Sequence, residues 1–371
     1  MKRLSSRKAS APDYVFLGVV AFLVVFGLVM LTSASSDLAA ARFGNSYYYL
    51  THQLLFGLLP GLIGFCVGFF VYYRHWERWA TVILIASIVL LILVFTPLGH
   101  AEKGATRWLS IGSFTFQPSE LLKLTFFIYL ASWISRNEAR RKSFSEGFLP
   151  FMLLVVGVVV LLIVQPATTV AILIFAASLG MYFTAGGRFS FIVVAVLIAG
   201  LGISLLIAVT PYRMQRILTF LHPNSDTQAS GYQITQAQNA IGSGRLLGVG
   251  FGKSTTKLKY LPEPIGDSIF AVIAEELGFV GATAVVLAFL FLVLRGLRIA
   301  RGAPDEFSRL LVTSFTVVLG LQAFVNMGAI SGIIPLTGVP LPFVSYGGTA
   351  LAVFLTMCGV IANISRHSRK I

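Results

Sequence analysis

Long runs of apolar residues, separated by shorter polar segments, cover most of this chain. A helix needs about 20 apolar residues to cross the hydrocarbon core of a bilayer. The candidate segments are 14–33, 52–72, 79–96, 118–135, 148–165, 168–185, 189–210, 268–294, 309–330 and 344–364. The pattern therefore predicts an all-α polytopic membrane protein with ten transmembrane helices.

Two connections between these segments are longer than the others. Residues 97–117 form a moderate loop, and residues 211–267 form a long one between helices seven and eight. Loops of that length are usually functional or disordered, but here aliphatic, aromatic and glycine residues alternate with polar ones, which favours re-entrant or interfacial packing. Within it, "YQITQAQNAI" (232–241) is suited to a short amphipathic helix. The glycines of "GSGRLLGVGFG" (242–252) would let backbone N–H groups approach a ligand closely.

Composition excludes a soluble protein. The chain has 371 residues, 56% of them hydrophobic and only 11% charged, with a mean hydropathy of +0.85. A globular domain needs more polar surface than this. The first apolar run is long and lacks a convincing cleavage site, so it is not a signal peptide. We expect one membrane domain over 1–371, with short tails at 1–13 and 365–371.

The basic residues predict an orientation, because Lys and Arg are retained on the cytoplasmic side. With the N-terminus inside, eighteen of them fall in cytoplasmic segments and nine outside, while Lys123 lies within the membrane. Both termini are thus expected in the cytoplasm and residues 211–267 outside it. The net charge of +14 follows from this rule and from anionic lipid headgroups. It does not indicate nucleic acid. Cys66 and Cys358, each in an apolar segment, are expected to be packing residues.

Four of the fourteen carboxylates lie in residues 260–278. Asp267 opens an apolar run at the external interface, where it would act as a helix N-cap, as a general base over a lipid headgroup, or as both. Glu275 and Glu276 lie about 12–14 Å deeper, turned away from Asp267. Carboxylates at that depth normally face the bundle interior and are paired. We expect them to form a structural network, with Gln322 and Asn326 as candidate partners.

Other polar residues also lie close to the external interface. Glu120 and Lys123 share one face of a helix at i, i+3, which predicts an ion pair, and such a pair in a membrane is also a functional candidate. Before them come Trp108, suited to the interfacial belt, and Arg107, whose guanidinium could bind a diphosphate bidentately. The long loop adds cations on the side where they are disfavoured, which an anionic headgroup would explain. These include Arg213, Arg216 and Lys257. Residues 331–351, which include Ser345, mix Pro and Gly and suggest a re-entrant wall around a site.

Together these stretches resemble the SEDS family (shape, elongation, division and sporulation), whose members are called FtsW and RodA. The resemblance covers nearly all of the chain. It is carried, in order, by "GATRWLSIGSFTFQPSELLK" (104–123), by "GYQITQAQNAIGSGRLLGVGFGKSTTKLKYLPE" (231–263) followed by "DSIFAVIAEELGFVG" (267–281), and by "GIIPLTGVPLPFVSYGGTAL" (332–351). The "SAS" at 33–35 and the short N-terminus favour the FtsW type.

The resemblance implies a function and a set of roles. Family members polymerise peptidoglycan from lipid II in the bacterial cytoplasmic membrane, during division or elongation. They work beside a class B penicillin-binding protein and other divisome or elongasome proteins. Asp267 would then be the essential carboxylate that deprotonates the acceptor sugar 4-hydroxyl, with inversion at the donor carbon and loss of undecaprenyl diphosphate. A divalent cation (Mg or Mn) is a possible but uncertain cofactor. The expected substrate-binding residues are Arg107, Trp108, Arg213, Arg216, Lys257 and Glu263, and the expected supports are Glu120, Lys123, Glu275, Glu276 and Ser345.

Two positions depart from the family pattern. Ile265-Gly266-Asp267-Ser268 stands where the family usually has His-Thr-Asp-Phe, so any role of that histidine is absent. In "QPATTV" (165–170), Ala167 replaces an acid that the family tends to carry, so this turn cannot supply a carboxylate or a metal ligand. With both groups absent, the expected reaction depends more strongly on the Asp267 carboxylate.

Two other functions compete with the transferase. A flippase for the lipid-linked precursor would need a polar path across both leaflets, whereas the distinctive polar residues here gather at the external interface. No paired broken segments of the transporter kind are evident either. A non-catalytic division scaffold would leave the external acid and bases unexplained. We therefore expect a glycosyltransferase.

Overall fold

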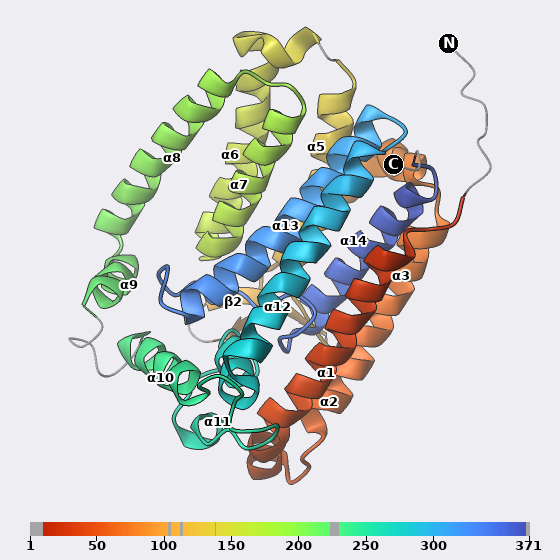
Figure 1. The fold of residues 1–371 in the computed structure, drawn as a ribbon. Helices are drawn as coiled ribbons and strands as arrows, with labels where there is room; N and C mark the ends of the chain where they lie inside the picture. The colour runs from red at the N-terminus through yellow and green to blue at the C-terminus, as the bar shows by residue number, and fades with distance from the viewer. Residues whose placement is uncertain (1–9, 103–104, 112–113, 138, 223–229, 369–371) are drawn as a thin grey trace.

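The computed structural model describes residues 10–102, 105–111, 114–137, 139–222 and 230–368. Most of them are helical, as the apolar runs predict, and the helices pack into one bundle (Figure 1). The α-helices are α1 (Tyr14–Phe43), α2 (Tyr48–Gln53), α3 (Leu59–Phe70), α4 (Tyr73–Leu93), α5 (Pro118–Ser135), α6 (Leu149–Val164), α7 (Thr168–Thr184), α8 (Phe189–Val209), α9 (Pro211–Leu221), α10 (Ser230–Ser243), α11 (Thr256–Lys259), α12 (Ile269–Arg301), α13 (Glu306–Ile330) and α14 (Gly348–Ser365). A π-helical turn, Leu54–Leu58, joins α2 to α3, a second, Phe144–Phe148, leads into α6, and a 3₁₀ turn covers Ala139–Lys142.

Within the described ranges, eight helices are long and apolar enough to cross a membrane. They match eight of the ten expected segments, with α2 and α3 forming a single span from Tyr48 to Phe70. The other two expected segments are α5 and α7. Helix α5 is less apolar because it carries Glu120 and Lys123, and α7 is shorter, with 17 residues. Large apolar side chains such as Leu197, Ile198 and Leu201 of α8 are exposed on the outside of the bundle, as expected for a surface that faces lipid. The chain is thus a multi-pass membrane protein, and the number of ten crossings stays a prediction.

The segment before α5 is not a plain loop, and here the all-α prediction is incomplete. Three strands form a small antiparallel sheet in the order β1 (Gly99–Glu102), β2 (Ala105–Ile111) and β3 (Phe114–Phe116). Leu109 pairs with Gly99 on one side and with Phe116 on the other. After β3, the N–H of Gln117 donates to Thr349 Oγ1 in the first turn of α14 at 3.3 Å. The sheet is therefore connected directly to the end of the bundle where α14 begins.

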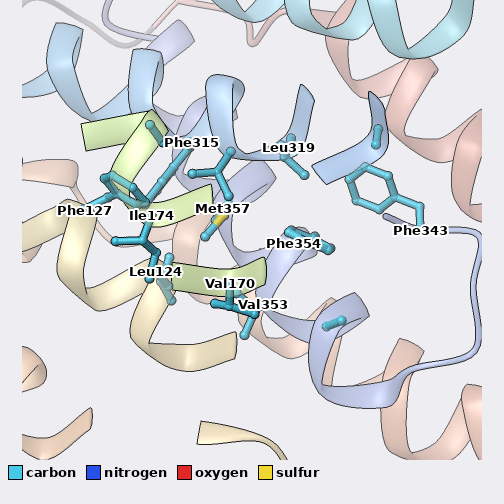
Figure 2. Packing of buried hydrophobic residues seen from close by; sticks show 14 of the residues in the cluster. Leu124, Phe127, Val170, Ile174, Phe315, Leu319, Phe343, Val353, Phe354 and Met357 are labelled. Atoms are coloured by element: carbon cyan, nitrogen blue, oxygen red, sulfur yellow. The ribbon is translucent and has the colours of Figure 1, made fainter. Parts of the chain in front are cut away.

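Helix α13 is central, packing against α5, α7, α12 and α14. Figure 2 shows the resulting core, where side chains of four helices meet: Leu124 and Phe127 of α5, Val170 and Ile174 of α7, Phe315 and Leu319 of α13, and Phe354 and Met357 of α14. Cys358 is buried in the same core, while Cys66 on α3 is exposed. This rigid centre fixes the positions of the segments at its two ends.

One end of the bundle holds both ends of the described chain. The N–H of Ser10 donates to the carbonyl of Arg366 at 2.8 Å, and the N–H of Asp13 donates to Ser365 Oγ at 3.0 Å. The opposite end, lower in Figure 1, holds α9, α10, α11 and the first turns of α12. The fold thus separates residues 211–222 and 230–267 from the two ends of the described chain, as the orientation predicts. The assignment of each end to one side of the membrane stays a prediction, and most of the two tails (1–9 and 369–371) lies outside the described residues.

Helix α12 is broken near its start, at Gly278, where φ is 68° and ψ is −168°. The glycine-rich segment 242–252 lies against this break. The N–H groups of Val249 and Gly250 donate to the carbonyls of Glu275 and Glu276, at 3.0 and 3.1 Å. In return, the carbonyls of Arg245 and Leu246 accept from residues 279 and 280. The backbone groups freed by the break are thereby satisfied, which buried polar groups require. The segment builds the fold around α12, a role different from the ligand contact that its glycines suggest.

Candidate active site

Asp267 lies just before α12, half-buried at the end of the bundle opposite the termini. The N-cap prediction is wrong in detail, because the helix begins at Ile269, its N-cap is Ser268, and no side chain caps it. The Asp267 carboxylate instead accepts a hydrogen bond from Gln233 Nε2 of α10 at 3.3 Å. The same amide nitrogen donates to Ser268 Oγ at 3.0 Å. This hydrogen bond links the Asp267 carboxylate to α10 instead of to the first turn of α12.

The backbone around Asp267 is held from several directions. Asn326 Nδ2 of α13 donates to the carbonyl of Asp267 and to that of Val339, both at 2.8 Å. Ser345 Oγ donates to the carbonyl of Gly266 at 2.6 Å and accepts from the N–H of Leu341 at 2.8 Å. The deep helix α13 and the segment 331–347 therefore hold the backbone around Asp267 in place.

Segment 331–347, which connects α13 to α14, forms a wall beside Asp267. An ideal Cβ built on Gly338 would lie 3.8 Å from Asp267 Oδ2, and Gly338 is exposed with a left-handed φ of 65°. A residue without a side chain at this point leaves the approach to the carboxylate open. The mixture of Pro and Gly therefore does form an irregular segment packed against the helices.

Leu336 and Thr337, which precede Gly338 in this wall, accept hydrogen bonds from α9 and α7 through their carbonyls. Arg216 donates to the carbonyl of Leu336 at 3.2 Å, and Thr169 at the start of α7 donates to the carbonyl of Thr337 at 2.7 Å. Arg213 donates to Thr168, also in the first turn of α7, at 3.1 Å. Two guanidinium groups are thus built into the framework that also carries Gly338 and Asp267. These threonines directly follow Ala167, in the turn that cannot supply a carboxylate.

The predicted ion pair in α5 is present and deeply buried. Lys123 Nζ lies 2.7 Å from Glu120 Oε2, and both side chains are almost inaccessible to solvent. Lys123 also donates to Gln322 Oε1 at 2.6 Å, while Gln322 Nε2 donates to the carbonyl of Pro340 at 3.0 Å. A chain of polar contacts therefore runs from α5 through α13 to the wall beside Asp267.

Glu275 and Glu276 do form a buried network, but not with the partners predicted from the helix positions. Glu276 pairs with Lys257 Nζ at 2.7 Å and accepts from Ser33 of α1. Glu275 accepts from the hydroxyls of Ser254 and Thr256. Gln322 and Asn326 instead contact other groups near the wall. Since the Lys257 ammonium already holds Glu276, a role for Lys257 in substrate binding requires that this pair opens.

The remaining predicted residues lie around the same end. Arg107 and Trp108 are half-buried in β2. Glu263 is exposed, and its backbone, with a φ of 53°, turns the chain into α12 while its carbonyl accepts from Gly266 and Ser268. The roles of these three residues in binding substrate stay predictions.

No group of three or more His, Cys, Asp or Glu side chains gathers among the described residues. A divalent cation at this site would therefore need oxygen ligands from a bound diphosphate or from water in addition to Asp267. Mg²⁺ commonly binds in that way, through one or two carboxylates and substrate phosphates. The donor set fits such an ion only together with substrate.

Sequence reasoning missed three contributors to the site: Gln233, the Thr168-Thr169 pair and Gly338. Gln233 lies in a helix that was expected from its pattern, but its contact with Asp267 joins segments 34 residues apart. Thr168 and Thr169 were seen only as part of a turn that lacks an acid. The positive φ of Gly338 was signalled by the Thr-Gly-Val-Pro sequence, since glycine is the usual residue in that conformation.

Replacing Ser345 by Ala should lower the free energy of unfolding by about 1–3 kcal/mol, because the buried groups at Gly266 and Leu341 lose their partner. It should also slow any reaction that depends on the position of Asp267. Thermal unfolding of the purified protein measures the first effect. Ser135→Ala is the matched control, because the hydroxyl of Ser135 donates to the carbonyl of Ser132 within its own helix. Equal stability of the two variants would contradict the role assigned to Ser345.

A comparison with protein families decides what the chain is. The sequence profile of the family described as "Cell cycle protein", which unites FtsW, RodA and SpoVE, matches residues 13–370. The chain belongs to this family. The match extends over almost the whole length, so the ordered motifs of an FtsW- and RodA-like protein are confirmed.

Individual relatives of this FtsW-like chain agree with the family. It is 39% identical over 364 residues to the probable peptidoglycan glycosyltransferase FtsW of Geobacter sp. (strain M18), covering 98% of this chain and 99% of that protein. It is 37% identical over 363 residues to stage V sporulation protein E of Bacillus subtilis (strain 168), with 98% and 99% covered.

Two solved structures share the fold. A chain from a peptidoglycan synthase complex, described as coordinating polymerization and crosslinking, aligns with a TM-score of 0.80 and 27% identity, covering 96% of this chain and 98% of that chain. The rod shape determining protein RodA of Thermus thermophilus aligns with a TM-score of 0.72 and 26% identity, with 97% and 99% covered. The helical arrangement around the site is therefore that of a SEDS protein.

Proposed function

We propose that this chain is a peptidoglycan glycosyltransferase that polymerises lipid II into glycan strands. The observation that carries the proposal is Asp267. Its carboxylate lies at the end of the bundle away from the termini, is oriented by Gln233 and lies beside the exposed Gly338. A general base must be both fixed in position and open to its substrate. The name of the Geobacter relative supports the same activity.

In the proposed reaction, the Asp267 carboxylate takes the proton of the acceptor sugar 4-hydroxyl. The resulting oxygen attacks the anomeric carbon of the donor, a new glycosidic bond forms, and the bond from that carbon to the diphosphate oxygen breaks with inversion. Undecaprenyl diphosphate leaves with the bonding electrons. Arg213 and Arg216 place positive charge at this end of the bundle, where it would stabilise the charge that develops on the leaving group. Arg107, Trp108 and Glu263 are the further proposed substrate contacts.

The buried groups give this site its rigidity. Glu120 and Lys123 reach the wall through Gln322, and Glu275 and Glu276 join α12 to the segment around Lys257. Catalysis by preorganised charge requires that the groups do not rearrange during the reaction. We therefore assign Glu120, Lys123, Glu275, Glu276 and Ser345 to support. A divalent cation bound with the diphosphate would add charge stabilisation to that of the arginines.

The proposed activity also implies a membrane orientation and protein partners. All ten apolar segments cross the bacterial cytoplasmic membrane, both termini lie in the cytoplasm, and the long 211–267 segment faces outward, where flipped lipid II is available. A class B penicillin-binding protein would crosslink the strands, within a divisome or elongasome. The solved peptidoglycan synthase complex that shares this fold supports such a partner. The relatives include both a probable peptidoglycan glycosyltransferase FtsW and a stage V sporulation protein E.

The test is reconstitution of the purified chain with a class B penicillin-binding protein and lipid II in proteoliposomes. Glycan strands should appear when both proteins are present, detected by gel electrophoresis after the crosslinking activity has been blocked. A parallel assay follows the movement of labelled lipid II between leaflets. Movement without polymerisation would contradict the transferase and favour a flippase. Neither activity, in a correctly folded complex, would favour a scaffold.

A further inference from the structure

The last turns of α12 carry a basic and apolar cavity that the reaction does not use. Its volume is about 350 Å³, and it is lined by Phe291, Leu294, Arg295, Arg298 and Arg301. At 100° per residue, these five positions fall within an arc of about 120° on one face of the helix. The site for lipid II lies at the other end of the bundle, near the start of α12. The cavity is therefore a separate feature.

The two ends of the cavity differ in chemistry. Phe291 and Leu294 are exposed apolar side chains, and they lie on the membrane side of the helix end. Arg298 and Arg301 are exposed toward the last turn, about 10–15 Å further along the axis from Phe291. A surface that is apolar on the membrane side and cationic at the interface complements a lipid with an anionic headgroup, in which the phosphate lies just above the acyl chains.

One of the three arginines is already neutralised within the protein. Arg295 Nε donates to both carboxylate oxygens of Asp13, at 2.9 and 3.0 Å, next to the start of α1. Among the lining residues and this partner, three positive charges thus face one negative charge, which leaves an excess of two. That ion pair also fixes α1 beside α12, so that the cavity lies on a rigid part of the bundle.

We infer that this cavity binds the headgroup phosphate of an anionic phospholipid, with Arg298 and Arg301 as its ligands and Phe291 and Leu294 in contact with the acyl chain. The retention of basic residues on one side of the membrane explains that arginines occur here. It does not explain why they share a face with two exposed apolar residues and line a cavity. An arginine pair is also the geometry that phosphate oxygens prefer, because each guanidinium can donate two parallel hydrogen bonds.

The inference is tested by titrating the purified protein, in a neutral detergent, with phosphatidylglycerol or phosphatidylcholine and counting bound lipids by native mass spectrometry. Wild type should retain phosphatidylglycerol in preference to phosphatidylcholine. Each guanidinium charge that is removed is expected to weaken the binding of an anionic lipid about fivefold. R298Q/R301Q should therefore lose about 25-fold in affinity for phosphatidylglycerol at this site. R298K/R301K should lose much less, because it keeps both charges.

The matched control is R78Q, since Arg78 is an exposed arginine of α4 on the same predicted side of the membrane. It should leave the affinity for phosphatidylglycerol unchanged. Equal losses in R78Q, or none in R298Q/R301Q, would overturn the inference. Inorganic phosphate is then added to the protein with phosphatidylglycerol bound. If it displaces the lipid at low millimolar concentration, the cavity is an anion site without lipid specificity, and the inference is wrong. Thermal unfolding of each variant verifies that it is folded.

Discussion

Replacing Asp267 by Asn should lower the rate of lipid II polymerisation by about 10²–10⁴-fold, the usual contribution of a general base. Asparagine has nearly the same shape and keeps a side-chain oxygen that can accept from Gln233, as the carboxylate does at 3.3 Å. The backbone contacts of Asn326 and Ser345 do not involve the side chain and should persist. The variant should therefore fold and bind its partner while losing only the group that takes the proton. Initial rates with the reconstituted complex measure the effect.

Asp37→Asn provides the matched control. Asp37 is an exposed carboxylate in the last turns of α1, at the same end of the bundle, and it is outside the proposed site. It should keep the wild-type rate. A rate for Asp267→Asn within a few-fold of wild type, at unchanged thermal stability, would remove Asp267 from the catalytic role. If the wild-type complex is itself inactive, the proposed function fails before this comparison is made.

The helices could be predicted because each apolar run is a local property of the chain. The contacts that complete the site could not be, because they join segments far apart in the sequence. Ser33 and Lys257 meet Glu276 from 243 and 19 residues away. Helix periodicity predicted that Glu276 turns away from Asp267, but it had no means of selecting Lys257 over Gln322 as the partner of Glu276. Local patterns determine which face a residue occupies, and the packing of helices determines what it meets there.

The break in α12 illustrates the same limit. Gly278 lies within an apolar segment, just after Glu275 and Glu276, and a glycine there predicts only a weaker helix. The break is stable because the glycines of 242–252 allow a close approach of two backbones. An ideal Cβ on Gly248 would lie 2.1 Å from the carbonyl oxygen of Glu276, and one on Gly244 would lie 2.0 Å from that of Ala274. The sequence displays these glycines clearly, but whether they face a ligand or another helix is decided only in three dimensions.

Replacing Lys123 by Met should destabilise the protein by about 3–5 kcal/mol, the usual cost of leaving one member of a buried ion pair alone. Glu120 is 3% exposed and would have to keep an uncompensated charge or take up a proton. Methionine has a similar length and suits the apolar contact with Phe354, over whose ring the Lys123 ammonium lies at 4.9 Å. The loss would therefore come mainly from charge and from the bond to Gln322, rather than from a cavity. The midpoint of thermal unfolding in detergent measures it.

A double-mutant cycle separates the pair from its surroundings. Glu120→Gln combined with Lys123→Met removes both charges, so the double variant should be more stable than Lys123→Met alone. Lys253→Met is the control for loss of a lysine charge, because Lys253 is exposed, and it should change the midpoint little. If Lys123→Met unfolds at the wild-type temperature, the pair does not support the bundle. If the double variant is stable but polymerises lipid II slowly, the chain of contacts through Gln322 to Pro340 serves the position of the wall beside Asp267.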